Sequence, residues 1–188
     1  VRPLPRRGPP RIQVFKTTDE VVFNRSDLTW PHLVVGQSEP LPLGVPIVNN
    51  LRRTLRDLNA RVLENEHFEA SSIVYPGLPA GATTQVAFQL TPKAAWAEPG
   101  VEIPVRIRVE SPALRWSYER TINLSTIAAG ENHRRTFLSP IDASVQYYGV
   151  RPPSNFDPER EYSLVMSLHG AGVEAINQTG SYAPKHWA

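Results

Sequence analysis

The residues most able to do chemistry lie near the end of the chain, where a run of strand-forming apolar residues stops at a glycine-rich turn. The run covers residues 164–168, and the turn that follows reads His-Gly-Ala-Gly at residues 169–172. A buried strand that opens into such a turn before a helix is where α/β enzymes direct backbone N–H groups toward an anionic ligand or an oxyanion. The pattern therefore predicts an anion-stabilising turn here.

The elements that must position this turn are predicted from the residues on either side of it. Apolar residues with strand-forming side chains predict a strand at 144–150 and a second, buried strand at 162–168. A proline-rich loop at 151–158 joins them. Residues 173–187 predict a helix, with Gly180 as a point where it breaks.

The region from residue 31 to residue 128 has the pattern of a domain made of short β-strands. Short apolar runs alternate there with turn-forming residues, and two of the runs alternate polar and apolar side chains as half-buried strands do. This spacing is typical of an immunoglobulin-like β-sandwich. The 19 prolines also suit a loop-rich β domain. The expected strands are Leu33–Gly36, Val45–Val48, Leu58–Leu63, Ser72–Tyr75, Thr84–Leu90, Val101–Val109 and Trp116–Leu124.

One segment of this region fits two structures. Leu51, Leu55, Leu58 and Val62 have helical spacing, whereas residues 57–64 also alternate as a strand. Because strands surround the segment, we predict a strand. Residues 1–30 are expected to be an extended lead-in with a short strand at 21–23.

The order of the elements near the end of the chain resembles the beginning of an α/β-hydrolase. The resemblance rests on the segment from Asp142 to Val150 and on the sequence Ser-Leu-His-Gly-Ala-Gly-Val-Glu-Ala at residues 167–175. The most similar proteins are exported esterases and prolyl-oligopeptidase-like serine hydrolases, which often carry a β-sandwich ahead of the catalytic domain. We therefore expect a mostly β chain: an immunoglobulin-like β-sandwich at 31–128, then the first strands and first helix of an incomplete α/β-hydrolase domain at 129–188, after a linker at 127–135.

The resemblance implies a role for each residue of the turn. In such enzymes a serine attacks an ester or amide carbonyl, and one of the two backbone N–H groups that stabilise the oxyanion comes from the loop after an early strand. Each such donor contributes on the order of 3 kcal/mol to transition-state stabilisation. Ala171, with Gly172 next, is expected to supply this N–H. Gly170 and Gly172 let the backbone turn without a Cβ clash, and His169 is expected to brace the loop.

The catalytic nucleophile is not expected within this chain. No Gly-x-Ser-x-Gly motif occurs in its 188 residues, and residues 180–182 do not match that motif. We therefore expect an N-terminal fragment of a serine hydrolase that is inactive alone, whose full-length form acts on an ester or peptide without a cofactor or metal. The alternative is a β-sandwich binding or adhesion module with no catalytic role.

Two other interpretations of the turn stay open. Residues 170–175 formally fit the dinucleotide-binding pattern G-x-G-x-x-G/A after a strand. Against it, His169 precedes the first glycine, and the acidic residue expected about 20 positions later falls beyond residue 188. The turn also fits a plain strand-to-helix connection that binds no ligand. We favour the hydrolase interpretation over both.

Composition narrows the class of protein. Apolar residues make up 40% and charged residues 20%, whereas disordered chains hold fewer apolar residues and more net charge. The formal net charge is +2 and the basic residues are scattered, so we expect no nucleic-acid surface. No apolar run approaches the roughly 20 residues that span a bilayer. The resemblance implies an exported bacterial protein, periplasmic or extracellular, although no signal peptide is visible.

The remaining polar and aromatic residues favour structural roles. Glu64, Glu66 and His67 are close in sequence, but a solvated strand end explains them better than a metal site. The tryptophans are expected in core or edge packing. Tyr147 and Tyr148 are neighbours on a strand, so one should point inward and the other outward. Three isolated histidines are expected on the surface or in loops: His32, His133 and His186.

Overall fold

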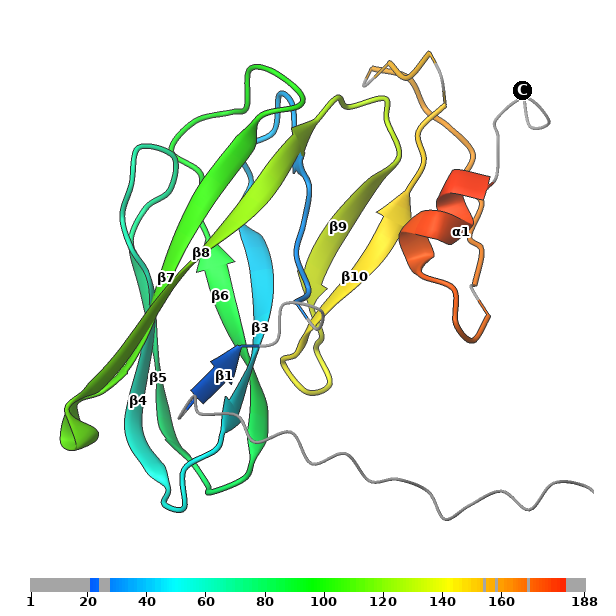
Figure 1. The fold of residues 1–188 in the computed structure, drawn as a ribbon. Coiled ribbons are helices and arrows are strands. Elements are labelled where there is room, and N and C mark those ends of the chain that lie inside the picture. Colours follow the sequence, from blue (N-terminus) through cyan, green and yellow to red (C-terminus); the bar gives the residue numbers. More distant parts are fainter. Residues whose placement is uncertain (1–20, 24–27, 154, 158, 169, 182–188) are drawn as a thin grey trace, which may run out of the picture.

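The computed structural model describes residues 21–23, 28–153, 155–157, 159–168 and 170–181. Within these residues the protein is mostly β, as predicted, with a 3₁₀ turn at Pro112–Leu114 and one short α-helix near the C-terminal end (Figure 1). The strands are β1 (Val21–Phe23), β2 (Leu33–Val34), β3 (Leu41–Asn49), β4 (Leu55–Val62), β5 (Ser71–Leu78), β6 (Thr83–Leu90), β7 (Glu102–Ser111), β8 (Trp116–Ile127), β9 (His133–Leu138) and β10 (Val145–Val150), and the helix is α1 (Ala175–Ser181).

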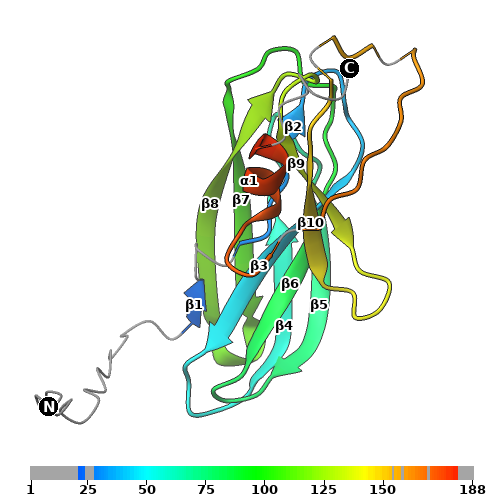
Figure 2. The ribbon, with the colours of Figure 1, turned by 90° about the vertical axis from the view of Figure 1, so that its right-hand side faces the viewer.

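The strands form three sheets. A five-stranded sheet has the order β2-β8-β7-β4-β5, and it is mixed because β2 runs parallel to β8. A three-stranded antiparallel sheet has the order β1-β3-β6, and β9 pairs with β10 as a separate hairpin. Figure 2 shows the hairpin and α1 on the side of the molecule that carries β3.

One hydrophobic core joins the two larger sheets. Each strand turns alternate side chains inward, so the apolar residues of β3 and β6 meet those of β4, β7 and β8 in a single buried cluster. In β7 the alternation is regular: Ile103, Val105, Ile107 and Val109 are buried, and the residues between them are not. Burial of each such side chain contributes about 1.5–3 kcal/mol. The core therefore fixes which face of each strand is inside.

β4 resolves the ambiguity between helix and strand in favour of the strand. Asp57 has a φ of 51°, and this left-handed residue shifts the alternation by one position. As a result Leu55 and Leu58 both point into the core, while Ala60 and Val62 resume the period of two. The helix-like spacing in the sequence is thus explained by a local irregularity in a strand.

The β9–β10 hairpin is attached to the body of the protein by side chains that bond to backbone. The Gln85 side chain of β6 binds both backbone groups of Val145, accepting from its N–H at 2.6 Å and donating to its carbonyl oxygen at 3.4 Å. Thr136 Oγ1 donates to the carbonyl oxygen of Pro42 in β3 at 2.6 Å. Because these bonds satisfy buried groups of the hairpin, it is held against β3.

Two predictions for the C-terminal part of the chain differ from the structure. Residues 133–135, assigned above to a linker, begin strand β9, so the connection from β8 to β9 covers only residues 128–132. Residues 162–168, predicted as a buried strand, form no strand among the described residues, and their side chains are exposed. β-Strand propensity alone cannot bury such a segment without neighbouring strands that pair with it.

Candidate functional site: the turn at residues 170–173 and the helix that follows it

The turn predicted to stabilise an anion is a type II β-turn. The N–H of Val173 donates to the carbonyl oxygen of Gly170 at 3.3 Å. Gly172, at the third position of the turn, has a φ of 80°, whereas Ala171 is not among the residues with positive φ. A type II turn requires a positive φ at this third position, which favours glycine there. Gly172 is therefore needed for the backbone shape of the turn.

Two backbone amides of this turn, those of Ala171 and Gly172, belong to exposed residues. Among the described residues, the N–H groups of Ala171 and Gly172 donate no hydrogen bond. The three residues 170–172 are exposed, and no Cβ placed on either glycine would meet another atom within 4 Å. The two N–H groups are thus accessible to an acceptor from outside these residues.

The segment before the turn exposes a large apolar surface. Leu164, Val165, Met166 and Leu168 are between 64% and 88% exposed. Contiguous apolar side chains of this kind are uncommon on the surface of a monomeric protein and are typical of interaction sites. His169, which joins this segment to the turn, lies outside the described residues.

Helix α1 is anchored to the β9–β10 hairpin by specific polar contacts. Asn132, just before β9, donates from Nδ2 to the carbonyl oxygen of Ile176 at 2.9 Å and accepts at Oδ1 from Thr179 Oγ1 at 2.8 Å. Thr179 Oγ1 and the carbonyl oxygen of Ala175 also approach Gly149 in β10 so closely that only glycine leaves enough room there. Gly180 lies within α1, which continues to Ser181, while residues 182–187 of the predicted helix lie outside the described residues.

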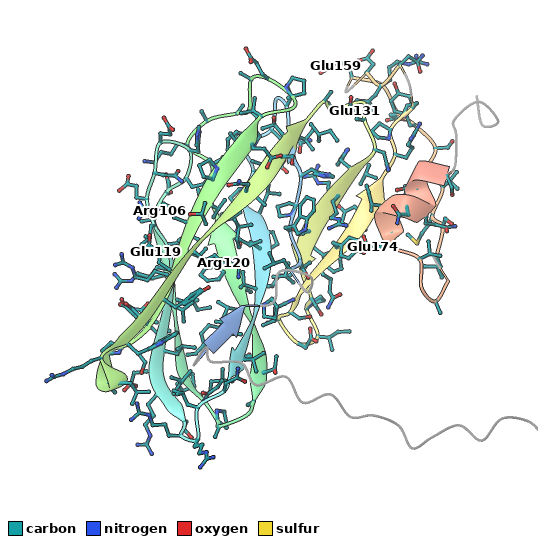
Figure 3. The ribbon with its side chains drawn as sticks, viewed as in Figure 1. Arg106, Glu119, Arg120, Glu131, Glu159 and Glu174 are labelled. Carbon is teal, nitrogen blue, oxygen red and sulfur yellow. The ribbon has the colours of Figure 1, made fainter. Side chains whose placement is uncertain are left out.

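An arginine links the turn to the hairpin. Arg134 in β9 forms an ion pair with Glu174, Nη2 to Oε2 at 2.7 Å, and Glu174 directly follows the turn. The guanidinium carbon of Arg134 lies 4.4 Å from the centroid of the Trp30 ring and 4.7 Å from that of the Tyr147 ring. Figure 3 shows Glu174 beside β10, at the start of α1. The cation therefore lies against two aromatic rings and bonds one carboxylate.

His32 fixes the backbone on the other side of Arg134. The Nδ1 atom of His32 accepts from the Arg134 N–H at 2.9 Å, and the His32 N–H donates to the Arg134 carbonyl oxygen at 3.0 Å. Burial, followed by the positive charge of Arg134, lowers the pKa of His32 to about 4. The ring is therefore neutral near pH 7, as its acceptor role requires.

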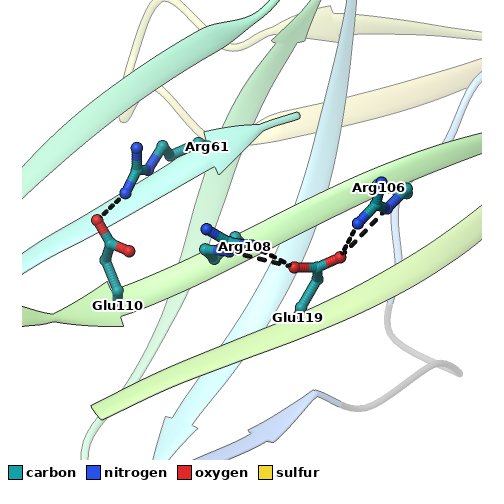
Figure 4. A network of polar contacts seen from close by, with 5 residues as sticks. All are labelled: Arg61, Arg106, Arg108, Glu110 and Glu119. Atoms are coloured by element: carbon teal, nitrogen blue, oxygen red, sulfur yellow. Dashed lines mark hydrogen bonds and ion pairs between the residues drawn. The ribbon is translucent and has the colours of Figure 1, made fainter. Parts of the chain in front are cut away.

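A cluster of charged side chains lies elsewhere, on the outer face of the five-stranded sheet. Figure 4 shows Glu119 of β8 bound by Arg106 and Arg108 of β7, with Glu110 bound by Arg61 of β4 nearby. Hydrogen bonds from Arg108 and Arg106 hold the pKa of Glu119 below its usual range. Each carboxylate in this cluster has a basic partner on a neighbouring strand. We therefore assign the cluster a structural role, as cross-strand ion pairs on a solvated face of the sheet.

The other residues discussed above have structural positions. Trp30 and Trp116 pack against the core and Trp96 is buried in it, whereas Trp187 is outside the described residues. Glu64 pairs with Lys93, and Glu66 with His67. Within the described ranges, no group of three or more His, Asp or Glu side chains lies close enough to hold a metal ion.

Two expectations about ring side chains had different outcomes. Tyr147 is half-buried against Arg134 and Tyr148 is 45% exposed, so the in-and-out alternation is confirmed. His133 was expected on the surface or in a loop, but it is 4% exposed and lies in β9, a strand that was not predicted. His186 is outside the described residues. The contacts of His32, Trp30 and Arg134 carry no sequence signal, since they join residues about one hundred positions apart.

Comparison with known protein families and with curated proteins finds no significant match to this chain. In the part of the chain that the structure describes, no helix has both the length and the apolar character that crossing a bilayer requires.

Proposed function

We propose that this chain is the N-terminal part of an exported bacterial serine hydrolase, an esterase or a peptidase, in which the turn at residues 170–173 supplies part of the oxyanion hole. In this proposal residues 31–128 form an immunoglobulin-like β-sandwich, and the α/β-hydrolase domain begins at residue 129. The serine, acid and histidine of the triad then belong to residues beyond 188. The single core shared by the two larger sheets supports the sandwich assignment.

The observation that carries the proposal is the combination found at residues 164–172. An extended, exposed apolar segment leads within a few residues into a turn whose Ala171 and Gly172 amides have no acceptor among the described residues. A strand buried on both faces, as in the central sheet of an α/β enzyme, needs this kind of apolar run. Partner strands supplied by a catalytic domain would bury the run and enclose the two amides in a water-poor site.

The chemistry follows from the two amides. When a serine attacks a carbonyl carbon, the carbonyl oxygen becomes negative, and a fixed N–H at about 2.7–3.1 Å from it lowers the barrier. In this proposal the Ala171 N–H, at the second position of the type II turn, faces the substrate carbonyl oxygen. The amide after the nucleophile would supply the second donor.

The test of this proposal uses the full-length protein, including whatever follows residue 188. We expect its sequence to contain a Gly-x-Ser-x-Gly motif and the purified protein to be labelled by a fluorophosphonate probe at that serine. The 188-residue chain alone serves as the control and should not be labelled. A full-length sequence without this motif, or one whose serine is not labelled, would contradict the proposal.

One observation favours a second function, a binding or adhesion module without catalysis. The β9–β10 hairpin is joined to β6 through Gln85, to β3 through Thr136 and to the start of β2 through His32. Residues 133–150 are therefore held against these strands and do not stand apart. If the hairpin only completes the β fold, the 188-residue chain should be monomeric and unfold in one transition. The labelling experiment separates the two functions, since a binding module is not labelled.

A further inference from the structure

We infer that Arg134 is a positioning residue for the turn at residues 170–173, because it holds Glu174 and thereby sets the direction of the Ala171 and Gly172 amides. The catalytic meaning of this inference rests on the function proposed above, whereas its structural part does not.

Both the side chain and the backbone of Arg134 are held in place by neighbouring groups. Its side chain is 12% exposed and lies against the rings of Trp30 and Tyr147. Cation–π contacts of this kind are stronger when the guanidinium is desolvated. The backbone of Arg134 is bonded in both directions to His32. An arginine fixed in this way loses little further side-chain entropy when it binds a carboxylate.

Glu174 connects the turn to helix α1. Val173, its neighbour, donates the hydrogen bond that closes the turn, while the carbonyl oxygen of Glu174 accepts from the N–H groups of Asn177 and Gln178, each at 3.0 Å. A restraint on the Glu174 side chain therefore acts on both the turn and the start of α1. The exposed carboxylate of Glu174 has no other hydrogen-bond or ion-pair partner among the described residues.

Arg134 also neutralises the negative charge of Glu174 next to the turn. A free carboxylate so close to the turn would repel an oxyanion that forms at the Ala171 amide, and the repulsion would grow as water is excluded. Pairing with the Arg134 guanidinium offsets this charge. The ion pair therefore both orients the two amides and removes an unfavourable charge next to them.

The structural test uses the 188-residue chain and the substitution Glu174→Ala, which removes an exposed side chain and leaves the core intact. The matched control is Glu39→Ala, because Glu39 pairs with Arg135, the neighbour of Arg134 in β9, and not with Arg134. By ¹⁵N relaxation, we expect the order parameters of Ala171 and Gly172 to fall from about 0.85 to below about 0.6 in Glu174→Ala alone. Unchanged values, or an equal loss in Glu39→Ala, would overturn the inference.

The kinetic test uses the full-length protein. We expect Glu174→Ala to lower kcat about 10- to 100-fold with KM unchanged, and Glu174→Gln, which keeps an oxygen acceptor for Arg134, to recover part of this loss. If the wild-type protein hydrolyses esters or peptides and Glu174→Ala does not change kcat, the positioning role is wrong. If the amides loosen but the wild-type protein is not a hydrolase, the proposed function fails and the structural restraint stands.

Discussion

A Cβ atom built on Gly149 would lie 2.7 Å from the carbonyl oxygen of Ala175, so β10 and the first turn of α1 are in backbone contact. The same Cβ would lie 2.6 Å from Thr179 Oγ1. Because Gly149 does not have a positive φ, its role here is spatial and not conformational. The helix that follows the candidate turn thus rests directly on the hairpin.

A side chain at Gly149 should therefore displace α1 and leave the sheets in place. We expect Gly149→Val to abolish hydrogen-exchange protection at Asn177 and Gln178 while the protection of β7 residues is unchanged. Gly130→Ala is the control, because nothing lies within 4 Å of a Cβ at that position. Retained protection in α1 of Gly149→Val would show that the helix does not depend on this contact.

Acidification should weaken the fold through His32. Its pKa in the folded protein is about 4, below the ordinary value of 6.5, so the unfolded chain binds a proton more readily than the folded one. The contribution of neutral His32 to the free energy of unfolding is therefore fully present above pH 6.5 and is lost as the pH falls toward 4. The groups that act on His32 are Arg134 and His133, which lower its pKa, and Glu102, which raises it.

The measurement for this prediction is the urea midpoint of unfolding at several pH values. His32→Asn keeps an acceptor near the position of Nδ1 but does not titrate, so we expect a smaller loss of stability between pH 6.5 and 4 in this variant. His133, whose pKa burial also lowers, accounts for part of the remaining loss. An identical pH dependence in wild type and His32→Asn would contradict the assignment to His32.

The exposed apolar segment should respond to substitution in opposite ways in the two forms of the protein. In the 188-residue chain, Leu164 is 85% exposed, so Leu164→Ala should change the free energy of unfolding by less than about 0.5 kcal/mol. Leu58→Ala, at a fully buried position in β4, is the matched control and should cost about 2–5 kcal/mol. In the full-length protein we expect Leu164→Ala to cost about as much as Leu58→Ala, because a catalytic domain would bury the segment.

Limited proteolysis should cleave the described part of the chain first in the segment between β10 and the turn at residues 170–173. We expect trypsin to cleave after Arg160, an exposed residue outside any helix or strand, before it cleaves after Arg135, which lies in β9 and pairs with Glu39. Residues 133–150 should resist cleavage, because the hairpin is hydrogen-bonded to β3 and β6. Fragment masses that show first cleavage after Arg135 would be evidence against the packing of the hairpin.

Much of the fold was predictable because most strands carry their own pattern. The alternation of Arg106, Ile107 and Arg108 predicts a strand with one buried face, and β7 has that face. β4 was assigned correctly although the spacing of its leucines also fits a helix. The left-handed conformation of Asp57 explains that helix-like spacing. Neighbouring strands supplied the deciding context in that segment.

The errors arose where structure depends on distant residues. β9 begins with His133, Arg134 and Arg135, polar residues with little strand signal, and it is held by His32 and Pro42 from far earlier in the chain. Residues 164–168 have strong strand propensity, yet propensity cannot provide a pairing partner. The type II shape of the turn was not predicted from the glycines, although Gly172 at its third position is typical of that turn.

The central claim is that the Ala171 N–H stabilises a developing oxyanion, and one substitution tests it most directly. Proline suits the second position of a type II turn and lacks only the N–H, so Ala171→Pro should preserve the turn while removing the donor. Ala171→Ser keeps the donor and is the control. In the full-length protein we expect Ala171→Pro to lower kcat for an ester substrate about 100- to 1,000-fold and Ala171→Ser to change it little. Equal kcat values for wild type and Ala171→Pro would contradict the claim.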